Sequence, residues 1–427
     1  MGRETCERPG TDGQDLSVND RFEARKAIES LRAGVPNLAA VSALGANLET
    51  IANAFERNCV SAIGRVSTEA IPRGFLIEGN FGSGKSHALR YLQTIAASKN
   101  MAFSTVAISK ETPLGDLTAI FRTAVATLNF GDRKLTGTLA GVFEELVRNE
   151  KTFDALCKKV SNPTYALDSQ FLAALQLLQR YRAAPEIMEQ LFDFFDGGPA
   201  QIAQWKQWLR EIDQSHLSLK AMRANDLAPQ RFRFVALVLA AAGFEGWFIA
   251  LDEVELIASF GQKARFKAYE NLAFLFEPPA DNESMRRWFV VGAITEDLGL
   301  ALFDKRHDDI AIVEKFGLDS ELRANGTLGI GILREVGRTH RLREPTDSVL
   351  REAHDRIREL YARAYDVRVD AVFDSDAIRA RSKSMRSYVR EWIAYWDLKM
   401  QDRAYQPVIE TREVAFSLEE DADLEAV

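Results

Sequence analysis

The sequence contains few of the residues that form disulfide frameworks and metal clusters. Only three cysteines and five histidines occur among its 427 residues, and neither set has the spacing of a metal site. An odd number of widely separated cysteines does not make a disulfide framework and is typical of a reducing compartment. A disulfide scaffold and a zinc module are therefore excluded, and we expect a cytoplasmic protein.

Long hydrophobic runs and an excess of positive charge are also missing. No apolar stretch reaches the roughly 20 residues of a membrane span, so no membrane contact is expected. The 62 acidic residues outnumber the 54 Lys and Arg residues, and the net charge of −8 disfavours nucleic-acid binding by overall electrostatics. Local basic faces still leave DNA contacts open. With 46% hydrophobic residues, the chain can bury a sizeable core.

A complete phosphate-binding motif, G-x-x-x-x-G-K-[ST], lies between an apolar run at 74–78 and a helical pattern that continues from His87. This strand–loop–helix context is the one that the motif requires. Its glycines let backbone N–H groups converge on a phosphate at the positive end of a helix. Lys85 is expected to reach the β- and γ-phosphates, and the Ser86 hydroxyl to ligate Mg²⁺. The expected ATP contacts in this segment are Gly79, Asn80, Phe81, Gly82, Ser83, Gly84, Lys85, Ser86 and His87.

Two carboxylates, Asp252 and Glu253, follow the apolar run 246–251. In phosphate-loop enzymes an Asp at such a strand end holds Mg²⁺. An adjacent Glu is placed to polarise the attacking water as a general base. A surface acidic pair is the simpler interpretation of this dipeptide alone. Together with the phosphate loop upstream, the pair favours ATP hydrolysis over passive nucleotide binding.

Other candidate residues follow later in the chain. Thr295 ends a fourth apolar run, and its hydroxyl is expected to orient the lytic water beside the γ-phosphate. An arginine that contacts the γ-phosphate is expected from a neighbouring subunit or from a C-terminal lid. Arg386 opens a helical pattern and suits a lid, whereas Arg306 would act across an interface. Lone arginines are usually surface charges, so neither arginine is preferred on this ground. A lid role for Arg386, an interface role for Arg306 and a homo-oligomer all stay open.

The order of these patterns predicts an α/β fold of the P-loop NTPase type. Apolar runs predict strands at 74–78, 102–108, 246–251 and 288–294, with a fifth near 339–343. Strands that alternate with helices indicate a parallel sheet. The expected segments are a disordered tail (1–20), N-terminal helices with the first half of the ATPase core (21–128), a helical insertion (129–230), the second half of the core (231–345), and a helical C-terminal lid with an acidic tail (346–427).

Five segments of the sequence carry a resemblance to a known family. The phosphate loop (79–87) and the acidic run (251–255) occur throughout a large superfamily, whereas RAGVPN within 27–37 and SKETPL within 108–114 are more specific. The segment 385–393 in the expected lid also matches. With these segments the chain resembles AAA-type phosphate-loop ATPases and, more narrowly, the ATP-binding proteins of bacteriophage-exclusion (BREX) defence systems, of the BrxD type.

The resemblance implies that Val35 and Pro36 contact the adenine. It also implies a helicase-like or methylation-linked partner with which the protein excludes phage DNA. The expected function is therefore an Mg²⁺-dependent ATPase that couples nucleotide turnover to contacts with such a partner or with DNA. The insertion 129–230 is the expected coupling surface, since it is not needed to build the nucleotide site. Two alternatives stay open: a nucleotide-gated scaffold with little turnover, and an origin-loader-like DNA-binding AAA ATPase.

Overall fold

The computed structural model describes ten stretches of the chain, which form two units. The described residues are 18–33, 48–64, 74–131, 133, 138–277, 287–316, 320–343, 345–370, 372 and 384–404. The first and the last three of these stretches form one unit, and those from 48 to 343 form the other. Among all of these residues, no helix has the length and apolar character that a membrane crossing requires.

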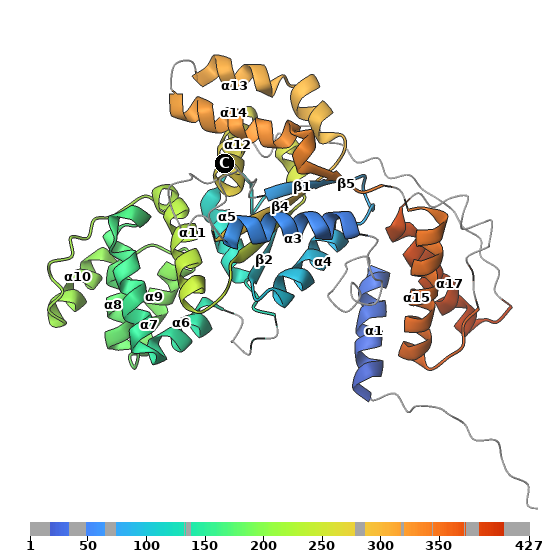
Figure 1. Cartoon of the computed structure of the whole chain (residues 1–427), viewed down its shortest axis with the longest axis horizontal. Helices are drawn as coiled ribbons and strands as arrows, with labels where there is room; N and C mark the ends of the chain where they lie inside the picture. Colours follow the sequence, from blue (N-terminus) through green and yellow to red (C-terminus); the bar gives the residue numbers. More distant parts are fainter. Residues whose placement is uncertain are drawn as a thin grey trace, which may run out of the picture. The chain divides into compact units, whose positions relative to one another are not determined.

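The larger unit is built on a five-stranded parallel sheet of order β2-β3-β4-β1-β5. Its strands, labelled in Figure 1, are β1 (Gly74–Glu78), β2 (Ala102–Ala107), β3 (Trp247–Asp252), β4 (Trp288–Ile294) and β5 (Thr339–Arg341). All four neighbouring pairs run parallel. The α/β fold that the sequence predicts is therefore confirmed, since each expected apolar run is a strand of this sheet.

The two faces of the sheet belong to different hydrophobic cores. Phe75 and Ile77 of β1 pack with α3 (Glu49–Gly64) and α4 (Lys85–Ser98), whereas Leu76 between them packs in the core on the other face. Successive side chains of a strand point to opposite faces, so a strand buried on both faces has a continuous apolar sequence. This is why the strands are evident in the sequence as unbroken apolar runs.

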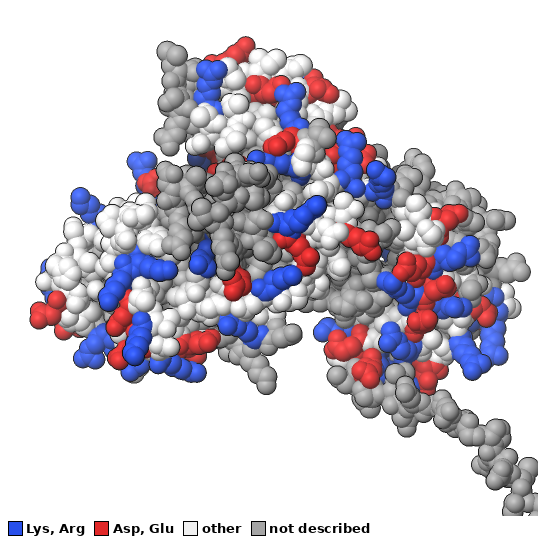
Figure 2. Space-filling model, in the orientation of Figure 1, with Lys and Arg blue, Asp and Glu red and all other residues white. Residues whose placement is uncertain are grey.

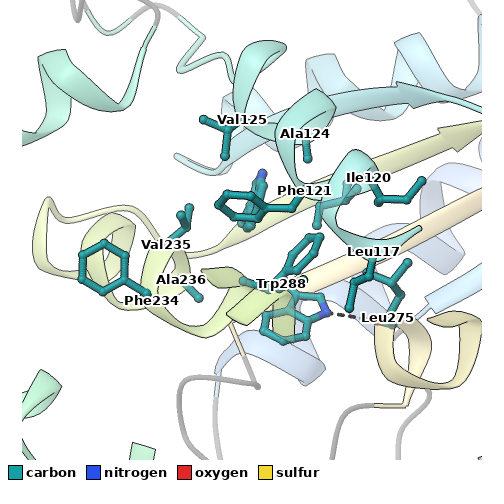
Figure 3. Packing of buried hydrophobic residues seen from close by; sticks show 14 of the residues in the cluster. Leu117, Ile120, Phe121, Ala124, Val125, Phe234, Val235, Ala236, Leu275 and Trp288 are labelled. Carbon is teal, nitrogen blue, oxygen red and sulfur yellow. Dashed lines mark hydrogen bonds between the residues drawn. The ribbon is translucent and has the colours of Figure 1, made fainter. Parts of the chain in front are cut away.

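A long helical connection between β2 and β3 completes the second core. Figure 3 shows side chains of its first helix, such as Phe121, packed against its last helix and Trp288 of β4. The Trp288 indole N–H donates to the Leu275 carbonyl oxygen at 3.0 Å. The helices of this connection are α5 (Leu117–Ala126), α6 (Leu139–Arg148), α7 (Glu150–Val160), α8 (Ser169–Tyr181), α9 (Pro185–Phe195), α10 (Ile202–Glu211) and α11 (Ala224–Ala241).

The helical block between β2 and β3 is continuous with the sheet core. Phe143 of α6 and Phe195 of α9 stack at 4.4 Å between ring centroids and lie in the same cluster as Trp247 of β3. Helix α11 begins at Ala224, within the range 129–230 that the sequence assigns to the insertion, and its Phe232 stacks on Trp247 of β3 at 5.6 Å between ring centroids. The block therefore has no separate core, because its aromatic side chains pack on the helices that cover the sheet.

Three further helices of the larger unit follow β3 and β4. Helix α12 (Gln262–Phe276) precedes β4, whereas α13 (Asp308–Phe316) and α14 (Ser320–Arg334) lie between β4 and β5. All three pack together, as Figure 1 shows. The link between α12 and α13 is a buried ion pair, Arg265–Asp308.

The smaller unit joins segments from both ends of the described chain. Helix α1 (Val18–Ala33) packs against α15 (Asp347–Tyr365) and α17 (Met385–Gln401). Its apolar residues Ala24, Ala27, Ile28 and Leu31 have helical spacing and enter the core of this unit. The sequence places this N-terminal helix in one expected segment (21–128) with the first half of the ATPase core, whereas in the structure α1 belongs to the unit of α15 and α17. Helical spacing reveals an apolar face but not the partner of that face.

Candidate functional site

The phosphate loop connects β1 directly to α4. Gly82 and Gly84 have φ angles of 78° and 105°, a left-handed conformation that side chains other than glycine rarely adopt. A Cβ atom on Gly79 would lie 2.5 Å from Ser83 Oγ, so only glycine fits there without a shift. The loop therefore needs its glycines, and it delivers the chain to the amino end of α4, where backbone N–H groups attract anions.

Lys85 is the first residue of α4, and its side chain is buried over the loop. Its ammonium donates to the Gly79 carbonyl oxygen at 3.0 Å and lies 3.5 Å from Glu255 Oε1. The expectation that Lys85 serves the phosphate loop agrees with this position. A buried ammonium held by one carbonyl and one carboxylate can exchange these partners for phosphate oxygens, which are also strong acceptors.

The acidic pair lies at the same edge of the sheet as the phosphate loop. Leu251 of β3 is in register with Gly292 of β4, and Ile294 of β4 with Glu78 of β1. Asp252, the last residue of β3, and the residues that follow the three strands therefore meet at the carboxyl edge of the sheet. The carboxylates and the loop, brought together across β4, are groups of the kinds that could hold a nucleotide and a metal ion.

The backbone at Glu253 is strained. Its φ angle is 59°, in the left-handed region, and its N–H donates to Asp252 Oδ1 at 3.0 Å. Such a conformation costs a non-glycine residue of order 1 kcal/mol and is concentrated at functional sites. At this residue the chain turns sharply from β3 into the short helix η2 (Val254–Ser259). The observation supports a functional position for Glu253.

Thr295 directly follows β4 and lies beside the phosphate loop. The Gly79 N–H donates to the carbonyl oxygen of Ile294 at 3.1 Å, which fixes the two strand ends next to each other. The hydroxyl oxygen of Thr295 is buried and has no hydrogen-bond partner among the described residues, and the same is true of Ser83 Oγ in the loop. Two buried hydroxyls without partners at one strand edge fit a bound polar group, because such groups normally find a partner.

Glu255 is a member of the site that the sequence does not predict. Its carboxylate is 2% exposed and forms the ion pair with Lys85, whereas its Oε2 has no hydrogen-bond partner among the described residues. Burial raises the pKa of Glu255 to about 7, against the opposing effect of Lys85 and with smaller contributions from Glu253 and Asp252. The signal was the third acidic residue of the run 251–255, which carries no fixed role in a phosphate-loop motif.

The family-typical segment 108–114 also lies at this edge of the sheet. The Ile108 N–H donates to the carbonyl oxygen of Asp252 at 2.9 Å, which extends the pairing of β2 with β3. Farther along the segment, the buried side chain of Asn271 on α12 donates to the Leu114 carbonyl oxygen at 2.8 Å. The segment thereby connects the acidic strand end to α12.

The other expected ATP contacts of the loop and of the first turn of α4 differ in exposure and charge. Asn80 and Phe81 are exposed on the loop, and Phe81 has 65% of its surface open to solvent. Ser86 is half-buried in the first turn of α4. Burial lowers the pKa of His87 to about 4, so its ring is neutral at pH 7 and adds no positive charge to the site.

Four expected residues are not among those that the described part of the chain brings to the phosphate loop. Val35 and Pro36 lie outside the described residues. Arg386 is half-buried in the first turn of α17, in the smaller unit, and its role as a lid residue stays a prediction. Arg306, the alternative, donates to the Ala301 carbonyl oxygen at 3.1 Å within its own segment.

The comparison with known families agrees with this geometry. The family model described as "BREX system ATP-binding protein BrxC/D" matches residues 20–391, which includes every site residue discussed above. A search of curated proteins found no match. On the family match over most of its length, the chain belongs to the BrxC/D family of BREX system ATP-binding proteins.

Proposed function

We propose that this protein is an Mg²⁺-dependent ATPase that couples ATP turnover to partner contacts in a BREX-like phage-defence system. The observation that carries the proposal is the strand register, which brings Asp252 and Glu253 to the edge that holds Lys85 and its loop. Membership in a family of ATP-binding proteins supports ATP as the nucleotide that binds. The acidic pair and the strained backbone at Glu253 support hydrolysis rather than binding alone.

Each site residue has a role that follows from its position. The loop N–H groups and Lys85 hold the phosphates, and the oxygens of Ser86 and Asp252 suit Mg²⁺, which prefers oxygen ligands. Bound there, Mg²⁺ would neutralise charge on the transferring phosphate. Glu253 accepts a proton from the attacking water, and the partner-free hydroxyl of Thr295 orients that water.

The test compares nucleotide binding with phosphate release in three variants. Lys85→Ala is expected to abolish binding of a fluorescent ATP analogue. Glu253→Gln should keep binding but lower turnover about 10²–10⁴-fold, the usual contribution of a general base. Glu245→Gln, an exposed glutamate just before β3, is the matched control and should change neither. Chelation of Mg²⁺ should stop turnover in the unmodified protein.

The outcome for Glu253→Gln separates an ATPase from a nucleotide-gated scaffold. Unchanged slow turnover in Glu253→Gln, with binding lost in Lys85→Ala, would show a switch that does not depend on a catalytic base. If the unmodified protein fails to bind ATP, the proposal as a whole is wrong.

Partner contacts are proposed for the helices α6 to α10. They lie on the far side of α5 and α11 from the sheet and contribute no residue to the nucleotide site (Figure 1). On the face in Figure 2, Lys and Arg side chains are interspersed with Asp and Glu, which suits a protein surface better than the DNA backbone. Deletion of this block is unsuitable as a test, because its core is continuous with the sheet. Charge-reversal variants of the exposed Lys158 and Lys159 should weaken partner capture without changing ATP binding.

A further inference from the structure

Glu255 forms an ion pair with Lys85, whose ammonium is the cation that a bound nucleotide needs. Lys85 has its ammonium 3.5 Å from Glu255 Oε1 and 3.0 Å from the Gly79 carbonyl oxygen. A phosphate in the loop would claim the same ammonium, since Lys85 is the residue of the motif that reaches the phosphates. Phosphate oxygens therefore compete with Glu255 for this ammonium.

Glu255 cannot easily remain charged once Lys85 has moved. Its side chain is 2% exposed, and its Oε2 has no hydrogen-bond partner among the described residues. A buried carboxylate without a counter-ion is strongly destabilised, and it takes up a proton instead. The free protein is already close to this transition, because burial raises the pKa of Glu255 to about 7.

The charges around Glu255 favour the same outcome. Lys85 is the cation that lowers its pKa, and Asp252 and Glu253 at the end of β3 raise it. The strand β4, which packs on η2, has no titratable residue. On α12, Arg265 is paired with Asp308, and Lys267 with Glu270. When Lys85 turns to the phosphates, Glu255 therefore loses the cation that lowers its pKa.

We infer that Glu255 is a positioning residue, which holds Lys85 in the empty loop and exchanges that ammonium for a proton when nucleotide binds. The inference rests on the proposed nucleotide site and adds to it a defined partner exchange. The proton comes from solvent and ends on the Glu255 carboxylate, and no covalent bond other than this O–H forms. Glu255 thus competes with the phosphates for Lys85 and couples nucleotide affinity to pH.

The test measures binding of Mg-AMP-PNP by calorimetry in two buffers that differ in ionisation enthalpy, which yields the number of protons taken up. At pH 8 the unmodified protein should take up close to one proton more than Glu255→Gln. Its affinity should fall by up to about tenfold per pH unit above 7, as expected for one linked proton. Glu255→Gln should lose this pH dependence and bind more tightly, because the amide competes less for Lys85.

Control variants separate this role from a structural one. Glu277→Gln removes the charge of another half-buried glutamate, which pairs with Arg338, and should keep the behaviour of the unmodified protein. Glu255→Asp keeps a carboxylate and should retain proton uptake. If Glu255→Gln does not fold, the unmodified protein alone still decides, since uptake should be much smaller at pH 6 than at pH 8.

The results distinguish this inference from the proposed function. Equal proton uptake and equal affinity in the unmodified protein and Glu255→Gln, with binding abolished by Lys85→Ala, would overturn the role of Glu255 alone. Weaker binding by a folded Glu255→Gln would also overturn it, because a residue that competes for Lys85 cannot aid the phosphates. Absence of nucleotide binding by the unmodified protein would overturn both.

Discussion

Asp308 and Asp309 are neighbours in the first turn of α13, and each forms an ion pair with an arginine at 2.7 Å. The two pairs differ in their access to water. The side chains of Arg265 and Asp308 are 4% and 0% exposed, whereas those of Arg334 and Asp309 are 53% and 26% exposed. This pair of neighbours tests how much burial adds to the worth of an ion pair.

The substitution Asp308→Asn is expected to be strongly destabilising. It leaves the Arg265 guanidinium buried without the negative charge of its partner, although it still donates to the Phe260 carbonyl oxygen, and it replaces the charged acceptor of the Tyr269 hydroxyl. Breaking a buried ion pair typically costs about 3–5 kcal/mol, and the retained carbonyl places this case near 3 kcal/mol. For the larger unit, with about 300 residues, the melting temperature should fall by about 4–6 °C.

The matched substitution Asp309→Asn is expected to cost about 0–1 kcal/mol, since water solvates the exposed Arg334 guanidinium when the partner charge is removed. Thermal and urea unfolding, followed by far-UV circular dichroism, would measure both variants. The two units can unfold in separate transitions, so each transition is fitted individually. Equal losses in the two variants, or a loss below about 1 kcal/mol for Asp308→Asn, would refute the reasoning that burial decides the cost.

Four further substitutions have defined outcomes. Gly329→Ala would place a Cβ atom 1.9 Å from the Tyr269 carbonyl oxygen and should lower the unfolding free energy by about 1–3 kcal/mol, whereas Gly331→Ala meets nothing within 4 Å and should stabilise α14 by up to about 1 kcal/mol in urea unfolding. Thr295→Ala should reduce turnover about tenfold with little change in ATP binding, because one hydrogen bond to the water is lost; an unchanged turnover in a phosphate-release assay would exclude Thr295 as a sensor. Burial lowers the pKa of His354, so the unfolded chain binds its proton first, and stability should be lost as pH falls below about 6.5. In His354→Gln the unfolding midpoint of the smaller unit should depend less on pH between 5 and 7, and an equal dependence would contradict this assignment.

The strands and the phosphate loop could be predicted because their signals are local. Buried parallel strands are apolar on both faces, so β1 and β4 coincide with their predicted ranges, and β3 is shifted by one residue. The phosphate loop is also local, since the left-handed conformations at Gly82 and Gly84 and the close approach at Gly79 depend on residues within the loop. Asp252 could be placed near it because carboxyl ends of parallel strands share one edge.

The contacts that could not be predicted join residues far apart in the sequence. Lys85 and Glu255 are 170 positions apart, and although the motif identifies Lys85, Glu255 alone resembles any other charged residue near a strand end. The partner of α1 was also missed, since its apolar face would have suited the sheet core as well as it suits α15 and α17. Such pairings depend on which surfaces remain uncovered after the sheet has formed.

By itself the sequence determined the strand order along the chain, the phosphate-binding loop and the acidic pair, because each is encoded by the periodicity or spacing of adjacent residues. The tertiary structure decided what these elements do to one another. It placed Glu255 against Lys85, left the hydroxyls of Ser83 and Thr295 buried without a partner among the described residues, and merged the helical block with the sheet core. The reason is that burial and ion pairing depend on neighbours in space, which the strand register brings together only when the chain folds.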